Sequence, residues 1–253
     1  MRHIILGYGS IGKRHYTNLK HLRPDDEIIT VDVNGEADIL FPINFSQSII
    51  KDSIAYICTP TELHLDQYKM MIFGDAKAVF VEKPLCSINQ KPFIDFPHRP
   101  FSVGYCYRYH PLFRELKSRV NEITLMRLFG SDNLSAKYGP TAMETMLSHS
   151  IDMALWLFGE AQTFDTKNGG DWAGCNIQHE KTHSRLQTNM FTLTRTASCF
   201  IRHANGEEYH EIPRSDQMYV DEIKAWLNYV ETGDAGDLCT LEQAIQVQKV
   251  MHG

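Results

Sequence analysis

Short apolar runs alternate with segments of helical periodicity over the first hundred residues. The runs HIILGYG, EIITVDV, SIAYICTP, AKAVFVEKP and FSVGYCY are apolar, with β-branched residues in each, and predict strands. Residues 10–22 and 62–73 repeat apolar side chains at helical spacing and predict helices. Continuous apolar strands that alternate with helices are typical of a parallel sheet covered on both faces. We therefore predict an α/β fold with a doubly wound parallel sheet.

The second half of the chain has a different pattern. Residues 112–120, 143–158 and 219–230 predict helices, and the capping-box sequence TLEQ at 240–243 predicts a last one. The segments ITLMRLFG and RLQTNMFTLTRTASCFIRHANGEEYHEIP alternate like half-exposed antiparallel strands, with a hairpin turn at Asn205-Gly206. We expect two domains, an α/β domain over residues 1–106 and an α+β domain over residues 107–253.

Glycines follow the first predicted strand at the spacing G-x-G-x-x-G. Gly7 permits a tight turn, Gly9 lets the backbone approach a pyrophosphate, and Gly12 lets the next helix pack closely. The start of that helix favours an anion. Asp32, twenty residues after Gly12, ends the second strand, where a carboxylate accepts from a ribose hydroxyl and repels a 2′-phosphate. This context predicts a dinucleotide site that prefers NAD over NADP. The alternative is a glycine turn in another kind of α/β protein.

Two further motifs follow strands of the same predicted sheet. CTPTELH at 58–64 and VEKPL at 81–85 lie at carboxyl ends, where ligands of open α/β folds bind. Lys83 stands between Glu82 and Pro84, and its ammonium is either held at the strand end or solvated in a loop.

The predicted helix over residues 143–158 carries a histidine at its middle. One face is apolar, and Thr145, His149, Asp152 and Trp156 share a second face. His149 is therefore either a proton-transfer group or a packed histidine. The tyrosines at 105, 107 and 109 alternate as on a strand, and packing explains them as well as substrate stacking does.

Composition excludes several other classes of protein. The 253 residues carry a net charge of −6, which does not suggest a nucleic-acid or acidic-membrane partner. No apolar run approaches the roughly 20 residues that a membrane span needs, and the first residues do not resemble a signal peptide. The six cysteines are widely spaced, without a CxxC pair. We expect buried thiols and a cytoplasmic location.

The sequence HEKTH at 179–183 matches the zinc-protease motif H-E-x-x-H. That chemistry needs both histidines on one face of a helix. The flanking residues GGDWAGCNIQ and SRLQTNMFTLT instead suggest a glycine loop that runs into a strand. We therefore expect no metal site here.

The ordered set GYGSIGKRH, TPTELH, VEKPL, GYCYRYHP, SHSIDMALWLFGE and DEIKAWLNYVETGD resembles the glucose–fructose oxidoreductase, inositol dehydrogenase and rhizopine-catabolism family (Gfo/Idh/MocA). The resemblance covers nearly the whole chain. Within the family, the sequence is most similar to members encoded beside surface-polysaccharide and sialic-acid-like sugar genes. The chain is also shorter than we expect, chiefly over residues 130–144 and near 169–170.

The resemblance implies a Rossmann domain and a second domain with an open, mostly antiparallel sheet, used for substrate binding and oligomerisation. It implies hydride transfer between a nicotinamide and a hydroxyl-bearing carbon of a sugar, polyol or sugar derivative. Lys83, His149 and Asp152 would be catalytic, with Lys83 and His149 assisting proton transfer. The substrate residues would be Arg108, Tyr107 and Thr145. The cofactor residues would be Gly7, Gly9, Ser10, Ile11, Gly12, Asp32, Thr59, Pro60, His64, Glu82 and Lys83.

One departure from the family pattern keeps alternatives open. Many members have an aspartate four residues before the catalytic histidine, where this chain has Thr145, which cannot carry a negative charge. Asp152 would lie on the face of His149, where a carboxylate can orient the imidazole ring. A non-catalytic dinucleotide-sensing protein and a reductase of a non-sugar substrate therefore remain alternatives. By analogy with the family, we expect a homodimer or homotetramer formed through the second-domain sheet.

Overall fold

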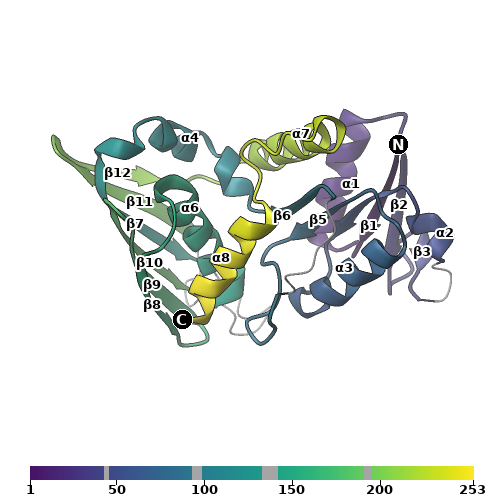
Figure 1. Ribbon diagram of the computed structural model, residues 1–253, viewed down its shortest axis with the longest axis horizontal. Coiled ribbons are helices and arrows are strands. Elements are labelled where there is room, and N and C mark those ends of the chain that lie inside the picture. The colour runs from purple at the N-terminus through teal and green to yellow at the C-terminus, as the bar shows by residue number, and fades with distance from the viewer. Residues whose placement is uncertain (43–45, 93–98, 133–141, 191–194) are drawn as a thin grey trace. The chain divides into compact units, whose positions relative to one another are not determined.

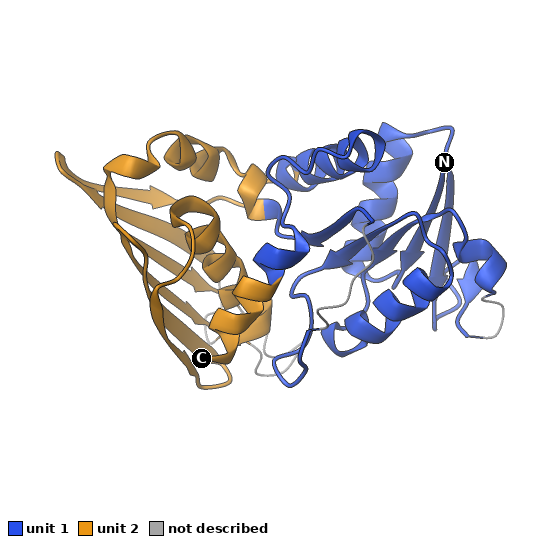
Figure 2. Ribbon diagram, in the orientation of Figure 1, with its two compact units in different colours: residues 1–106, 217–244 blue, residues 107–216, 245–253 orange. Residues whose placement is uncertain are grey.

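A computed structural model describes residues 1–42, 46–92, 99–132, 142–190 and 195–253 (Figure 1). The chain forms two compact units (Figure 2). Unit 1 consists of residues 1–106 and 217–244, and unit 2 consists of residues 107–216 and 245–253. Each unit is built around one six-stranded sheet.

The sheet of unit 1 is entirely parallel, in the order β3-β2-β1-β4-β5-β6. Every residue of β4 and β5 is buried, as expected for strands covered on both faces. The doubly wound sheet predicted from the sequence is therefore confirmed. The strands are β1 (Arg2–Leu6), β2 (Glu27–Asp32), β3 (Ile39–Leu40), β4 (Ile54–Ile57), β5 (Ala78–Glu82) and β6 (Phe101–Gly104).

The helices of unit 1 cover both faces of this sheet. The connections β1–β2 and β4–β5 run in opposite directions along the sheet, so right-handed crossovers put their helices on opposite faces. Figure 1 shows α1 beside α7 and α3 on the other side. The helices are α1 (Ser10–Leu22), α2 (Gln47–Ile50), α3 (His64–Phe73) and α7 (Gln217–Thr232), with a short 3₁₀ turn, η1 (Thr61–Leu63), before α3.

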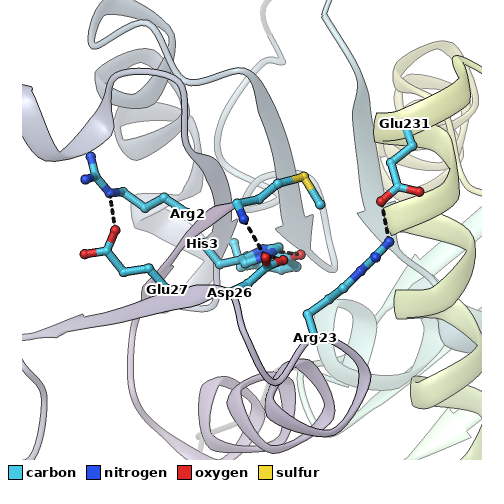
Figure 3. Close-up of polar contacts among 8 residues, drawn as sticks. Arg2, His3, Arg23, Asp26, Glu27 and Glu231 are labelled. Carbon is cyan, nitrogen blue, oxygen red and sulfur yellow. Dashed lines mark hydrogen bonds and ion pairs between the residues drawn. The ribbon is translucent and has the colours of Figure 1, made fainter.

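Helix α7 belongs to unit 1, although the sequence analysis assigned residues 217–244 to the second domain. The buried Trp226 ring packs on Phe80 of β5, with centroids 5.7 Å apart. Arg23, next to the end of α1, forms an ion pair with Glu231 of α7 (Figure 3). Helical periodicity correctly predicted that α7 is amphipathic, but periodicity does not say which sheet an apolar face will cover.

A polar cluster at the start of β1 ties this strand to the turn before β2 (Figure 3). Asp26 accepts from the amino group of Met1 at 2.5 Å and lies 3.0 Å from the His3 Nε2 atom. The His3 ring is buried, and burial lowers its pKa below the ordinary value of 6.5.

The sheet of unit 2 is mostly antiparallel, in the order β12-β11-β7-β10-β9-β8. Only the β7–β10 pair is parallel, and the hairpin turn at Asn205-Gly206 joins β11 to β12 as predicted. Figure 1 shows α4 and α6 on one face of this sheet. The strands are β7 (Ile123–Ser131), β8 (Thr163–Asn168), β9 (Trp172–Gln178), β10 (His183–Asn189), β11 (Thr196–His203) and β12 (Gly206–Glu211).

The remaining elements are α4 (Pro111–Ser118), α6 (Ser148–Phe158), α8 (Leu241–His252) and the 3₁₀ turns η2 (Cys106–Tyr109) and η3 (Val120–Glu122). Two sequence predictions were wrong here. Residues 172–178 form β9 rather than a glycine loop, and residues 106–109 form η2 rather than a strand. Glycine in β9 and tyrosines in η2 gave misleading local signals, which the neighbouring strands and helices override.

The predicted helix over residues 143–158 begins with a π-helical turn, η4 (Met143–Leu147), and becomes α-helical only at Ser148. Bonds in a π turn join residues five apart, so Thr145 does not lie one α-helical turn before His149 as the sequence analysis assumed. Asp152 and Trp156 are buried along with the apolar face, so α6 is buried on most of its surface. The segment 133–141, on which the expected shortening of the chain partly falls, lies outside the described residues.

All six cysteines are buried and unbridged, as predicted. In the part of the chain that the structure describes, no helix is long and apolar enough to cross a membrane.

Candidate functional site

The loop between β1 and α1 is closed on one side and open on the other. A Cβ atom at Gly12 would lie 1.9 Å from the Gly7 carbonyl oxygen, and one at Gly7 would lie 2.7 Å from the Cys58 carbonyl. Gly7 also has a φ of +88°, which favours glycine. At Gly9, in contrast, a Cβ atom would meet nothing within 4 Å. The glycines at 7 and 12 therefore allow the loop to close, while the backbone at Gly9 is open to a ligand.

The start of α1 suits an anion. Gly9 is the N-cap residue, no side chain caps the first N–H groups, and the first turn contains no acidic residue. The positive end of the helix dipole and the N–H groups of the exposed Gly9 and Ser10 therefore form a surface that fits a pyrophosphate. Ile11 follows Ser10 in this turn and is half-buried.

The Asp32 carboxylate is held beside the same loop. Its Oδ2 atom accepts from the Tyr8 N–H at 2.5 Å, and its Oδ1 atom accepts from the Asn34 N–H at 3.0 Å. A carboxylate has about four lone-pair sites, so these two bonds leave acceptor capacity for a further hydroxyl.

Two exposed apolar side chains follow the two strands that flank β1. They are Val33, which follows β2, and Leu63 of η1, which follows β4. Their surfaces suit the flat face of a base.

His64 joins the loops that follow β4 and β5. Its Nδ1 atom lies 2.9 Å from the Pro84 carbonyl oxygen, and its Nε2 atom lies 2.9 Å from the Thr59 carbonyl oxygen. The ring is buried, and burial lowers its pKa, while the two carbonyls raise it. His64 therefore ties together the two sequence motifs in which we expected cofactor residues. Pro60 is exposed, and the Thr59 hydroxyl donates to Gln67 at 2.6 Å.

Glu82 is buried and held from two sides. Its Oε1 atom lies 2.6 Å from the Nε2 atom of His15, and its Oε2 atom accepts from the Lys83 N–H at 3.3 Å. Lys83 is half-buried, and its peptide bond to Pro84 is cis. No motif in the sequence singles out His15, although this histidine shares the spacing 12-15-19 with the buried Gly12 and Leu19 on one face of α1. That spacing could have indicated a histidine turned towards the sheet.

In unit 2, Arg108 and Asp152 form a buried ion pair. The guanidinium Nε atom donates to Asp152 at 3.0 and 3.2 Å, and the Nη2 atom donates at 2.5 Å. Both side chains are almost inaccessible to solvent. Removing either partner would leave a buried charge uncompensated, so the pair strongly couples η2 to α6. The structure thus brings two of the expected site residues together, in a contact that the sequence analysis did not anticipate.

His149 is half-buried beside Tyr107. The two rings meet edge to face, with centroids 5.0 Å apart and planes at 77°. The Tyr107 hydroxyl accepts from the Arg195 Nη2 atom at 3.4 Å. The Thr145 hydroxyl is directed to the Met190 sulfur at 3.7 Å. Of the residues expected to act on substrate in unit 2, Arg108 pairs with Asp152 and Tyr107 packs on His149, whereas Thr145 contacts Met190.

Residues 179–182 of the HEKTH segment form the turn between β9 and β10, and His183 begins β10, so the segment is not a helix. His179 is buried, with Nδ1 3.0 Å from the Gly159 carbonyl oxygen and Nε2 3.0 Å from the Ser184 hydroxyl, whereas His183 is exposed on β10. His179 thus holds the end of α6 against the sheet. Among the described residues, no group of three or more His, Cys, Asp or Glu side chains is arranged to hold a metal ion.

No family model matches the sequence, and no curated protein sequence matches it either. Solved structures do match. A probable dehydrogenase from Thermotoga maritima is 15% identical, with a TM-score of 0.78, and the match covers 100% of this chain and 95% of that chain. The WlbA (WbpB) dehydrogenase from Thermus thermophilus, in complex with NAD and UDP-GlcNAcA, is 16% identical, with a TM-score of 0.77 and coverage of 100% and 94%.

The UDP-N-acetylglucosamine 3-dehydrogenase GnnA from Acidithiobacillus ferrooxidans is also 16% identical, with a TM-score of 0.76 and coverage of 99% and 95%. At these identities the likeness establishes the fold. The chain has the fold of the Gfo/Idh/MocA-type dehydrogenases, a Rossmann unit followed by a mostly antiparallel sheet, as the resemblance implied.

The buried His64 makes the free energy of unfolding depend on pH. The lowered pKa of His64 means that the unfolded chain takes up a proton near pH 6.5 while the folded chain does not. His64 therefore contributes stability above pH 6.5 that is lost as the pH falls towards its folded pKa. We predict that urea unfolding from pH 8 to 5.5 shows a smaller loss of stability for His64→Gln than for the unchanged protein. The exposed His183→Gln is the control, and parallel curves for all three would contradict the prediction.

Proposed function

We propose that the protein is an NAD-dependent oxidoreductase that moves a hydride between nicotinamide and a hydroxyl-bearing carbon of a sugar or sugar derivative. The observation that carries this proposal is the loop at Gly9, which is open beside an uncapped helix start and the Asp32 carboxylate. Dehydrogenases of the same fold that have been solved with NAD, among them WlbA and GenD2, support it.

The residues that would hold the cofactor come from three loops of unit 1. The first turn of α1 would take the pyrophosphate through N–H groups at Gly9, Ser10 and Ile11, with Gly7 and Gly12 shaping the loop. Thr59, Pro60 and Glu82 would line the site, with His64 holding the two later loops together. A bound nicotinamide supplies the hydride acceptor or donor for this chemistry.

Asp32 would set the preference for NAD. Its carboxylate accepts from a ribose 2′-hydroxyl, whereas a 2′-phosphate would bring two negative groups together. Glu36 adds a second acidic side chain on the segment after β2, where it is paired with Lys13. NADP is therefore the less favoured cofactor.

The chain's own residues would handle the proton. Oxidising a carbinol carbon requires removal of the hydroxyl proton, and an imidazole can take or return it near neutral pH. We assign this role to His149, whose ring is packed against Tyr107. The Lys83 ammonium would stabilise the developing alkoxide. Asp152 would act as a positioning residue, since its carboxylate is paired with Arg108 and fixes η2 on α6.

The second sheet would join two copies of the chain. Arg127, Phe129, Phe200 and Tyr209 point to one face of this sheet, because Phe200 pairs with Tyr209 and Arg127 across the strands and Ser198 pairs with Phe129. Phe129 and Tyr209 are exposed, and Arg127 lies over the Phe200 ring at 5.3 Å. An aromatic face of this kind suits association with a second copy.

The cofactor assignment predicts tighter binding of NADH than of NADPH. Fluorescence titration should show this difference, and Asp32→Asn should reduce it by about tenfold, or about 1.4 kcal/mol, by removing the negative charge. Gly9→Ala should weaken binding of both nucleotides without lowering the melting temperature, because its methyl group meets only open space in the protein. Binding of neither nucleotide would refute the proposed function.

The proton-transfer assignment predicts that His149→Ala lowers turnover by about 10²–10⁴-fold. Affinity for NADH should stay unchanged, because the imidazole serves the substrate. His183→Ala, at an exposed histidine of the same unit, should turn over like the unchanged protein. Wild-type turnover in His149→Ala would contradict the assignment and indicate that His149 is a packed histidine. Cofactor binding without any hydride exchange across a sugar panel would instead favour a dinucleotide sensor. That alternative is supported by Thr145, an uncharged residue where many members of the family have an aspartate.

The association surface predicts a dimer or tetramer in light scattering. Phe129→Glu should shift the protein towards monomer, since a carboxylate would have to be buried at the interface. Phe73→Glu is the control, because Phe73 is an exposed phenylalanine in unit 1, outside the second sheet. A monomeric unchanged protein would contradict the proposal.

A further inference from the structure

Two buried histidines of unit 1 hold the residues on either side of Lys83. Before the lysine, the Glu82 Oε1 atom lies 2.6 Å from the Nε2 atom of His15 on α1. After it, the Pro84 carbonyl oxygen lies 2.9 Å from the Nδ1 atom of His64 on α3. Both imidazole rings are buried, so water does not compete for these bonds. The segment that carries Lys83 is therefore anchored by helices from both faces of the parallel sheet.

The His15 ring serves the Glu82 carboxylate alone. Its Nδ1 atom is buried and has no hydrogen-bond partner in the part of the chain that the structure describes. The ring packs against Phe80 and Tyr56, with centroids 5.5 and 6.1 Å away, so its orientation is fixed by the core of the sheet. An ionised carboxylate only accepts hydrogen bonds, so the Nε2 atom donates. The contact with Glu82 therefore uses one N–H group, which a glutamine side chain also supplies.

Glu82 transmits this contact to Lys83. Its Oε1 atom is held by His15, and its Oε2 atom accepts from the Lys83 N–H at 3.3 Å. The carboxylate also lies close to Gly104 on β6, where a Cβ atom would be 3.1 Å from Oε1. Because a carboxylate is a rigid planar group, fixing Oε1 also fixes the direction in which Oε2 accepts. His15 thereby sets the orientation of the Lys83 N–H through a third residue.

We propose that His15 is a positioning residue for Lys83 and acts through the Glu82 carboxylate. This inference rests on the proposed function, in which the Lys83 ammonium stabilises the developing alkoxide. That stabilisation depends on placement, and a displacement of about 1 Å can lower a rate by about 10²-fold. His15 lies on the same helix whose first turn would bind the pyrophosphate, so α1 aligns the lysine with the cofactor.

Amide hydrogen exchange in the ligand-free protein tests this contact directly. In His15→Leu the Glu82 carboxylate loses its anchor, so the Lys83 N–H should exchange about tenfold faster. In His15→Gln the rate should stay close to that of the unchanged protein, because the glutamine amide supplies one N–H near the position of Nε2. Leu19→Ala is the matched control. Leu19 is buried on the same face of α1, so this variant should melt at a lower temperature but keep the original Lys83 exchange rate.

Turnover and nucleotide binding test the catalytic consequence. The substrate is the sugar that the unchanged protein oxidises fastest in the panel, and ADP is the binding probe because it lacks the nicotinamide half of the cofactor. His15→Leu should lower kcat about 10–100-fold, with recovery in His15→Gln. It should change the Kd of ADP by less than about twofold. On a Glu82→Gln background, His15→Leu should have little further effect on kcat, since the two residues act as one unit.

Three results would overturn the proposal: unchanged Lys83 exchange in His15→Leu, fully additive effects of His15→Leu and Glu82→Gln on kcat, or a loss of ADP affinity as large as the loss of turnover. The last result would place the effect of His15 at the anion site. If His15→Leu does not fold, His15→Asn takes its place, because its shorter side chain withdraws the N–H from Glu82. The proposed function fails separately, through absence of NADH binding or of turnover, and exchange at Lys83 still decides the role of His15.

Discussion

The candidate site of unit 1 depends on the close contact between α1 and the loop before it. Gly12 approaches the Gly7 carbonyl so closely that no side chain fits between them, and a side chain at Gly7 would clash with the Cys58 backbone just after β4. This packing brings the N–H groups of the first helical turn to the carboxyl edge of a parallel sheet, beside Asp32. From the same helix, His15 reaches the Glu82 carboxylate. One helix therefore shapes the candidate anion site and also holds the Glu-Lys-Pro segment at the end of β5.

Unit 2 relies on a different interaction, the buried ion pair between Arg108 and Asp152. A bidentate pair out of contact with water fixes the relative position of η2 and α6. Tyr107 directly precedes Arg108, and His149 lies about one turn before Asp152 on α6, so their edge-to-face contact is fixed as well. Asp152 thus influences His149 through the packing of two elements, and Tyr107 extends the arrangement to Arg195.

Local patterns predicted much of the fold. The bounds of α1 were anticipated to the residue, and the hairpin at Asn205-Gly206 followed from its turn chemistry. The errors have physical causes. The strand β9 contains glycine and follows a Gly-Gly pair, so its local signal favoured a loop, but pairing with β8 and β10 makes it a strand. The π turn at 143–147 buries Met143 and Leu147 as an α-helix would, so the spacing of apolar residues could not predict the π turn. Periodicity also could not assign α7 to a unit.

The sequence by itself determined those features that depend on neighbouring residues: the glycine spacing, the acidic end of β2, the Glu-Lys-Pro turn and the histidine within a helix. Each requires only local backbone geometry, which the residue types control directly. Tertiary structure alone decided the partners, namely Arg108 for Asp152, His15 for Glu82, the two carbonyls for His64 and Arg195 for Tyr107. In three of these four pairings the partners lie more than forty residues apart along the chain. Only packing around the two sheets brings such residues together, and local sequence patterns do not predict these long-range contacts.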